Sequence, residues 1–240
     1  MRTCASFSNK GSRENNEDAV SIISCDQDIC MIAADGLGGH GKGEIASATA
    51  IEVAEQCFGK QGWYDHFFSC YFTECENKLE EKQKQERSYD GIKTTVVMAC
   101  ISDGILHCAH VGDSRLYFFR KKRLQYRTLD HSVPQMLVYA GEIREKQIRN
   151  HPDRNRLLKV MGQKSESVYF EEDKAWDIRN KDAVLVCTDG FWELIQEKYM
   201  CKTLKKAECA EEWLRLMQEI VIKNGSGKDM DNYSAAAIMF

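Results

Sequence analysis

Two apolar runs that each lead into an Asp-Gly pair are the sequence feature that most constrains how this chain can fold. Residues 31–34 run into Asp35-Gly36, and residues 184–188 run into Asp189-Gly190. Both runs have the length and composition of a buried strand. A carboxylate at the end of a buried strand is costly unless its charge is compensated, and a bound cation can do this. We therefore expect the fold to bring these two strand ends together around metal.

The first of these pairs opens a glycine-rich turn. Four glycines lie between positions 36 and 41. Because glycine has no side chain, such a turn lets the main chain approach a ligand or an ion closely.

The composition is that of an ordinary globular protein and excludes several classes of partner. Of the 240 residues, 43% are hydrophobic and 29% are charged, and the net charge is −4. This balance argues against binding to nucleic acid or to an anionic membrane surface, which requires a basic face. There is no apolar run long enough to span a bilayer, and the polar first 19 residues lack the apolar centre of a secretory signal. We expect no nucleic acid and no membrane among the partners.

The cysteines indicate the compartment. Their number, eleven, is odd, and none forms a Cys-x-x-Cys pair. Several fall inside apolar runs, so we interpret them as reduced core thiols of a cytoplasmic protein. A zinc site or a disulfide framework is the weaker interpretation.

The order of predicted elements indicates an antiparallel α+β layer fold, because hairpins and helices are mixed and do not alternate as parallel βαβ units would. Turn dipeptides separate four successive strands, which predicts an antiparallel meander. No repeat, linker or boundary is evident, so residues 1–240 are expected to form a single domain. The predicted strands are 20–24, 29–34, 93–101, 105–111, 115–119, 124–128, 168–170, 183–187 and 234–240. The predicted helices are 44–58, 63–86, 133–140, 191–195 and 210–222.

Further carboxylates lie near the predicted strand ends. Glu17 and Asp18 precede the first predicted strand, Asp113 lies in a Gly-Asp-Ser turn, and Asp231 precedes the last strand. Carboxylate oxygens suit hard divalent cations such as Mg²⁺ and Mn²⁺. Each acid alone fits an ordinary turn residue equally well. Asp35 and Asp189 are harder to explain in that way because both follow apolar runs.

An ordered set of motifs covers nearly the whole chain. These are Arg13-Glu14-Asn15-Asn16-Glu17-Asp18, Ala34-Asp35-Gly36-Leu37-Gly38-Gly39-His40, Gly43-Glu44-Ile45-Ala46-Ser47, Thr94-Thr95, His110-Val111-Gly112-Asp113-Ser114-Arg115, Leu129-Asp130-His131-Ser132, Gly141-Glu142-Ile143, His151-Pro152-Asp153-Arg154-Asn155-Arg156-Leu157-Leu158, Cys187-Thr188-Asp189-Gly190 and Asp231-Asn232. In this order they resemble the metal-dependent protein serine/threonine phosphatases of the PPM class, also called the PP2C family, and most closely its compact bacterial members. Each motif alone is of modest specificity, whereas the collinear set is very specific.

The resemblance implies a sandwich of two antiparallel β-sheets flanked by helices, in α-β-β-α layers, with two Mn²⁺ or Mg²⁺ ions at one end. It makes Asp35, Asp189 and Asp231 the catalytic carboxylates. Asp35 would bridge both ions, Glu17 and the Gly36 carbonyl would hold one of them, and Asp189 and Asp231 would hold the other.

The remaining site residues follow from the same resemblance. Asp113, together with Asp189, would offer a third, weaker metal site. Asp18 and Asn232 would support the ligands from behind, with Asp18 contacting water on the ions. Arg13, which on its own reads as an ordinary surface arginine, would hold the substrate phosphate. A planar guanidinium suits this role because it can donate two parallel hydrogen bonds. The segment 133–156 would contain a flap bordering the cleft.

The chain departs from the family pattern at two places. Many eukaryotic members have histidine directly after the first Asp-Gly, as a proposed general acid, and here this position is Leu37. That role cannot be transferred; His40 is a nearby alternative, although a structural role at the helix start fits it better, and water is another proton source. The family's Gly-Thr-Thr is Lys93-Thr94-Thr95, which leaves the metal ligands intact.

The expected function is hydrolysis of phosphoserine and phosphothreonine in proteins, by water activated at a dinuclear centre, in opposition to a serine/threonine kinase. We expect a monomer. One alternative is a catalytically inactive relative that serves as a regulatory binding module, which lost ligands would reveal; every expected ligand is present. Another is a phosphatase for one dedicated regulator, but such proteins usually carry an additional sensory domain.

Overall fold

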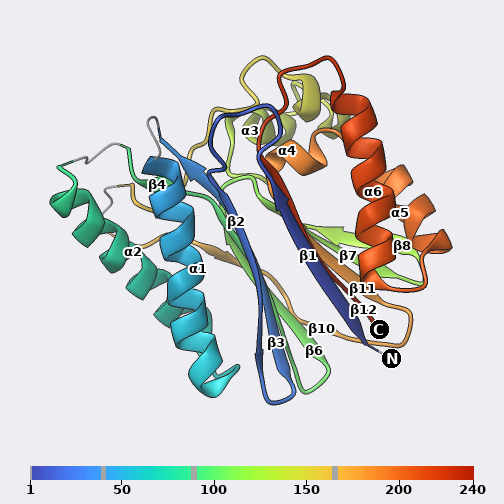
Figure 1. Cartoon of the computed structure of the whole chain (residues 1–240), viewed down its shortest axis with the longest axis horizontal. Helices are drawn as coiled ribbons and strands as arrows, with labels where there is room; N and C mark the ends of the chain where they lie inside the picture. The colour runs from blue at the N-terminus through green and yellow to red at the C-terminus, as the bar shows by residue number, and fades with distance from the viewer. Residues whose placement is uncertain (1, 39–41, 88–90, 164–166) are drawn as a thin grey trace.

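Two antiparallel β-sheets pack face to face in the computed structural model, which describes residues 2–38, 42–87, 91–163 and 167–240 (Figure 1). The five-stranded sheet has the order β1-β12-β11-β7-β8, formed by Thr3–Asn9, Tyr233–Met239, Ala183–Cys187, Arg115–Arg120 and Arg123–Arg127. The seven-stranded sheet has the order β10-β6-β5-β3-β2, formed by Trp176–Asp177, Ile105–Val111, Val96–Ser102, Asp28–Leu37 and Asp18–Cys25. Two short strands extend it, β4 (Lys93–Thr94) beside β3 and β9 (Glu171–Glu172) beside β6.

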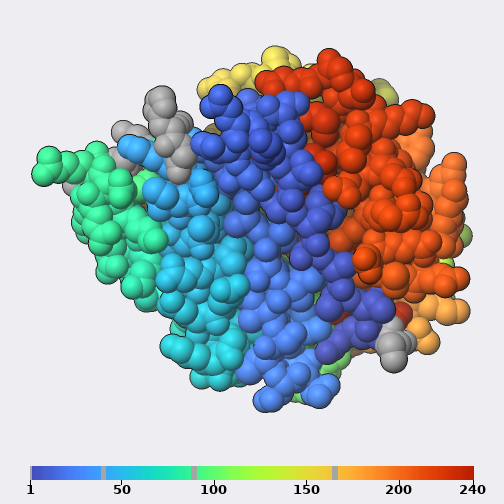
Figure 2. All heavy atoms as spheres, viewed as in Figure 1, coloured from blue at the N-terminus to red at the C-terminus, as the bar shows by residue number. Residues whose placement is uncertain are grey.

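Helices cover the outer faces of both sheets (Figure 1). α1 (Lys42–Gln61) and α2 (Phe67–Gln85) lie on the side of the seven-stranded sheet, and α5 (Glu197–Lys206) and α6 (Ala210–Gly225) lie on the side of the five-stranded sheet. The short elements α3 (Val133–Tyr139), η1 (Glu145–Asn150) and α4 (Asp189–Trp192) complete the set. In the space-filling view, the N-terminal residues in blue fill the boundary between the α1 side and the red C-terminal part (Figure 2). The fold is therefore the expected α-β-β-α sandwich.

Burial on both faces explains why the central strands are continuously apolar. Along β3, Met31 and Ala33 face the core between the sheets, whereas Cys30, Ile32 and Ala34 face the core under α1 and α2. A strand buried on one face only would alternate polar and apolar residues. The apolar run before Asp35 is thus a strand that passes through the middle of the molecule.

The structure corrects several expectations about individual elements. The predicted meander breaks after 105–111, because residues 112–114 carry the chain from one sheet to the other. The structure divides the strand predicted at 93–101 into β4 and β5, and it assigns no strand to residues 168–170, since the strand begins at Glu171. The helix predicted from residue 63 begins at Phe67, after His66 in the left-handed conformation.

Four elements were not predicted, namely β1, η1, β10 and α5. β1 has only two apolar side chains that pack on the core, Ala5 and Phe7, so its period is hard to detect among small polar residues. α5 is short and rich in lysine, and buries only Met200, Thr203 and Leu204.

No helix in the described parts of the chain combines the length and the apolar character needed to cross a membrane. All eleven cysteines are free thiols, and five of them are buried.

Candidate active site

The predicted carboxylates meet in one cleft of about 430 Å³. Strands and loops of both sheets contribute its walls. The charged and ligand-type residues that line it are Arg13, Glu17, Asp35, Gly36, Asp113, Asp189, Asp231 and Asn232. The structure therefore brings together residues from the two ends and the middle of the sequence, and Leu37, Asn155 and Leu157 add to the same wall.

Backbone geometry fixes Asp35. The register of β2 and β3 places Asp18 directly opposite Asp35. The Asp35 N–H donates to Thr95 Oγ1 at 3.1 Å, and its carbonyl accepts from Thr94 Oγ1 at 2.8 Å. The next residue has to be glycine, because a Cβ on Gly36 would lie 2.0 Å from the Gly43 carbonyl oxygen. The strand end is thus held firmly against the start of α1.

Asp113 is held by a buried network behind the cleft. Gly112 has φ +100 and packs against Thr95, so the turn that carries Asp113 requires glycine. The Asp113 carbonyl accepts a hydrogen bond from Trp192 Nε1 at 2.9 Å. The Arg115 guanidinium lies over the Trp192 ring at 3.3 Å and is paired with Asp130 at 2.6 Å. Asp113 is only 4% exposed.

Asp189 and Asp231 lie on the side of the five-stranded sheet. Asp189 begins α4 directly after β11, and Asp231 precedes β12. The Asn232 side chain accepts from the Glu17 N–H at 2.7 Å and donates to the carbonyls of Lys10 and Asn15 at 2.9 and 3.0 Å. Asn232 therefore ties the start of β12 to the N-terminal segment that carries Arg13 and Glu17.

Asp18 is buried beside these residues. Its Oδ2 accepts from Thr188 Oγ1 at 2.7 Å, and its Oδ1 has no hydrogen-bond partner among the described residues. A buried, unpartnered carboxylate oxygen is costly and is usually explained by an absent water or ion.

Arg13 lies at the mouth of the cleft but is already engaged. Its Nε and Nη2 donate to Oδ1 and Oδ2 of Asp231, both at 3.1 Å. Asp229 lies 3.6 Å from Nη1. The guanidinium thus occupies the same carboxylate that the resemblance assigns to a metal.

The acidic side chains crowd one another. Burial, and then the nearby Asp189, hold the pKa of Asp35 well above its ordinary value, and burial followed by Asp189 does the same for Asp113. Burial raises the pKa of Asp18 to about 8. Burial, followed by Glu193 and Asp231, raises that of Asp189 to about 7. Such a cluster of oxygen donors with excess negative charge fits hard divalent cations.

The flap segment is anchored beside the cleft by two ion pairs. Arg154 Nε lies 2.9 Å from Glu193 Oε1, and Arg149 pairs with Glu197. Both acids belong to the region of α4 and α5, and neither was predicted as a site residue. Glu193 follows Asp189 by one helical turn, a spacing that could have indicated it. His40, the alternative proton donor, lies outside the described residues.

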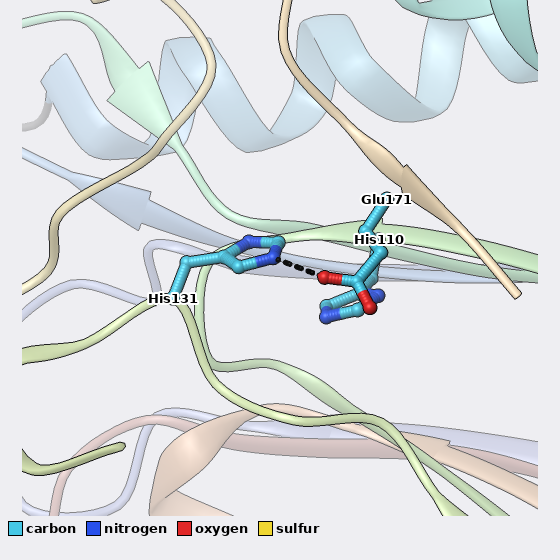
Figure 3. Close-up of side chains that lie close together, drawn as sticks. All are labelled: His110, His131 and Glu171. Atoms are coloured by element: carbon cyan, nitrogen blue, oxygen red, sulfur yellow. Dashed lines mark hydrogen bonds and ion pairs between the residues drawn. The ribbon is translucent and has the colours of Figure 1, made fainter. Parts of the chain in front are cut away.

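The structure also gathers three residues that were not predicted as ligands. One nitrogen or oxygen atom from each of His110, His131 and Glu171 lies within 4.8 Å of the others (Figure 3). This group does not line the cleft, although His110 and His131 belong to motifs that flank Asp113 and follow β8.

Three comparisons relate the chain to known proteins. A family model described as Protein phosphatase 2C matches residues 8–231. The serine/threonine phosphatase stp of Listeria welshimeri is 30% identical over 212 residues, which are 83% of this chain and 81% of that protein. The crystal structure of Stp1 from Staphylococcus aureus superposes with a TM-score of 0.89 at 24% identity, covering 100% of this chain and 95% of Stp1. The catalytic domain of the phosphatase PstP, solved with two manganese ions, gives a TM-score of 0.83 at 24% identity, covering 99% and 97%.

Proposed function

This chain belongs to the protein phosphatase 2C family and is a metal-dependent protein serine/threonine phosphatase, and from this premise we propose the role of each residue in its cleft. The observation that carries the proposal is that five acidic side chains from both sheets line one cavity. The raised pKa values of Asp35, Asp113 and Asp189 indicate a charge that cations would compensate. The donors are all oxygens, which favours Mn²⁺ or Mg²⁺.

Asp35 would lie between two ions. Glu17 and the Gly36 carbonyl would hold one of them, and Asp189 and Asp231 would hold the other. When bound, such a pair neutralises the phosphate dianion and lowers the pKa of a water molecule that attacks phosphorus in line. The backbone contacts of Asp35 to Thr94 and Thr95 support this role, because they fix the backbone position from which the carboxylate extends.

Arg13 would exchange partners during the reaction cycle. An ion at Asp231 competes with the guanidinium for the carboxylate oxygens, so loading the site would free Arg13. Its fork would then donate two hydrogen bonds to the substrate phosphate, for which it has the matching geometry. Asn155 and Leu157 would form the wall of the substrate site on the flap side.

Asp113, with Asp189, would supply a third and weaker ion site. Asp18 would accept a hydrogen bond from water on the ions through its unpartnered Oδ1. Asn232 would act on the ligands only through the backbone that it ties together. Leu37 lines the cavity and cannot transfer a proton, so we propose that the leaving oxygen takes its proton from water.

The natural substrates would be phosphoserine and phosphothreonine proteins made by a serine/threonine kinase. We propose that residues 1–240 act as one catalytic domain, as a monomer in the cytoplasm, with two Mn²⁺ or Mg²⁺ ions and a third at higher concentration.

The test is hydrolysis of a phosphothreonine peptide by the full chain, with Mn²⁺, with Mg²⁺ and with EDTA. We expect turnover with either ion, none with EDTA, and recovery when Mn²⁺ is added back. The Asp35→Asn variant, checked for folding by circular dichroism, is the control for contaminating phosphatase. Full turnover by metal-stripped protein, or turnover with zinc alone, would contradict the two-ion assignment. Mn²⁺ binding without any turnover would favour the regulatory binding module.

A further inference from the structure

His110, His131 and Glu171 lie close enough together to suggest a metal site (Figure 3). His110 is carried by β6 and Glu171 by β9, and these two residues are paired across the strands. His131 follows β8 of the five-stranded sheet, and its ring contacts both His110 and Glu171. Their hydrogen bonds decide between a metal site and another function.

The two nitrogens of His131 have opposite roles. The Gly112 N–H donates to His131 Nδ1 at 3.1 Å, so Nδ1 must carry a lone pair. The ring proton therefore sits on Nε2, which donates to Glu171 Oε2 at 3.1 Å. A metal bound to Nε2 would need a lone pair on that nitrogen. The ring proton would then have to move to Nδ1, where it would face the Gly112 N–H. Metal-ligating histidines instead donate their second nitrogen to an acceptor. The arrangement opposes a metal ion.

The same contacts hold both polar groups of Gly112. The His131 backbone N–H donates to the Gly112 carbonyl at 2.9 Å, while the His131 ring accepts from the Gly112 N–H. Gly112 has φ +100, and the next residue is Asp113. The direction of the Asp113 side chain thus depends on the preceding residue, whose N–H and carbonyl both form hydrogen bonds with His131.

His110 fixes the plane of the His131 ring. The two rings stack with centroids 4.6 Å apart and planes 9° apart. His110 is fully buried, and its Nε2 donates to the Leu129 carbonyl at 2.8 Å. The His131 ring therefore cannot rotate without breaking this stack and the bond to Glu171.

We propose that His131 is the positioning residue of the Gly112–Asp113 turn, and that Glu171 keeps it in the tautomer that accepts the Gly112 N–H. Glu171 thereby acts on the active site from outside the cleft. The consequence for ion binding rests on the proposed role of Asp113.

The test exploits the different reach of two amides. The Oδ1 of asparagine falls near the position of Nδ1 and can still accept from Gly112, whereas the glutamine amide reaches the position of Nε2. In His131→Gln we expect the Gly112 amide to exchange with solvent about tenfold faster than in wild type, as for the loss of one neutral hydrogen bond. In His131→Asn the rate should stay near that of wild type. His107→Asn is the matched control, because His107 lies on β6 with His110 but stacks on Trp63 and not on His131.

Two further measurements complete the experiment on the full chain without substrate. The ¹⁵N shifts of His131 should report an unprotonated Nδ1, and Glu171→Leu should mix the tautomers while Glu171→Gln, which keeps an acceptor, should not. Mn²⁺ calorimetry should show weaker binding at the weakest site in His131→Gln and little change in His131→Asn.

Equal exchange rates in His131→Gln and wild type would overturn the proposal, as would a His131→Asn variant as defective as His131→Gln. Stoichiometric Zn²⁺ binding that Glu171→Leu abolishes would also overturn it, in favour of a metal site. The exchange and shift measurements need no catalysis, so they remain decisive if wild type fails to hydrolyse phosphopeptides, which would refute only the proposed function.

Discussion

The Asp231 carboxylate faces both Arg13 and the cavity, and this double position could not be predicted from the sequence. Asp35 and Asp189 are recognisable as candidates because a carboxylate follows an apolar run. Arg13 and Asp231 stand 218 positions apart in polar segments; Asp231 on its own fits an ordinary turn residue equally well, and only the resemblance gave Arg13 a role. The pairing of their side chains depends on the three-dimensional arrangement of strand ends, which no local pattern encodes.

Arg13→Ala should weaken substrate binding without weakening Mn²⁺ binding, because Arg13 competes with the ion for Asp231. Losing a charge-assisted hydrogen bond costs roughly 1.5–3 kcal/mol, which corresponds to about tenfold to a hundredfold in KM or kcat/KM. Kinetics on a phosphothreonine peptide and Mn²⁺ calorimetry measure the two effects separately. Arg13→Lys should recover part of the lost substrate binding, since an ammonium supplies the charge without the two parallel N–H donors of a guanidinium. Weaker Mn²⁺ binding with an unchanged KM would show that Arg13 supports the metal and not the phosphate.

Asp35→Asn should reduce turnover far more than Asp113→Asn. Asp35 is proposed to bridge two ions, and losing that bridge removes several kcal/mol of charge stabilisation, on the order of a hundredfold or more in kcat. Asp113 is proposed to touch only a weaker third ion, so its loss should stay within about tenfold at saturating Mn²⁺. Peptide kinetics on both folded variants would decide. Equal turnover of the two variants would remove the distinction between their roles.

At the scale of elements, the end of β3 and the start of α1 meet without room for a side chain. The sequence predicted that the glycines after Asp35 allow close approach of the main chain to a ligand. The structure shows that Gly36 and Gly43 are required for packing of the strand end on the helix start, whereas the approach to a ligand stays a prediction. A glycine-rich segment indicates that something lies close to the main chain, but it does not say what. The contact between the backbones of Gly36 and Gly43 therefore became visible only in the fold.

Two glycine substitutions on these elements should therefore have opposite effects. Gly36→Ala would place a Cβ 2.0 Å from a backbone oxygen, so we expect loss of Mn²⁺ binding and a clear loss of stability. Gly59→Ala lies on the exposed side of α1, where the nearest atom would be 3.9 Å away. It should stabilise the protein by roughly 0.5–1 kcal/mol through helix propensity. Urea unfolding of both variants tests this. A stable, metal-binding Gly36→Ala would show that the strand end can shift.

At the scale of the whole molecule, the order of elements predicted the layered α+β class but not which strands pair. The turn at 112–114 resembles an ordinary hairpin connection, yet it joins the two sheets. Both β6 and β7 are largely buried on both faces, so their periodicity does not tell a hairpin partner from a strand in the facing sheet. Only the resemblance to a known family supplied the sandwich.

Divalent ions should stabilise the folded protein more at pH 8 than at pH 5.5. The raised pKa values of Asp18, about 8, and Asp189, about 7, mean that the metal-free fold holds protons that the unfolded chain has lost above about pH 4. Its free energy of unfolding therefore falls as the pH rises through this range. Divalent ions that bind the ionised carboxylates in place of those protons should restore the free energy of unfolding that is lost at high pH.

Melting temperatures with Mn²⁺ and with EDTA, measured at both pH values, test this prediction. The difference between the two curves should widen with pH, and Asp18→Asn should reduce the widening. A difference that is independent of pH would mean that these carboxyls are already ionised without metal.

The pairing of β1 with β12, in which Thr3 lies opposite Met239, has a consequence for synthesis on the ribosome. β1 lies at the edge of its sheet, and β12 is its neighbour there. β1 leaves the exit tunnel before β12 and therefore stays unpaired until translation has reached β12. An exposed strand edge in a nascent chain invites wrong pairing. The small polar residues of β1, which hid it in the sequence, also make it a poor template for aggregation while it waits.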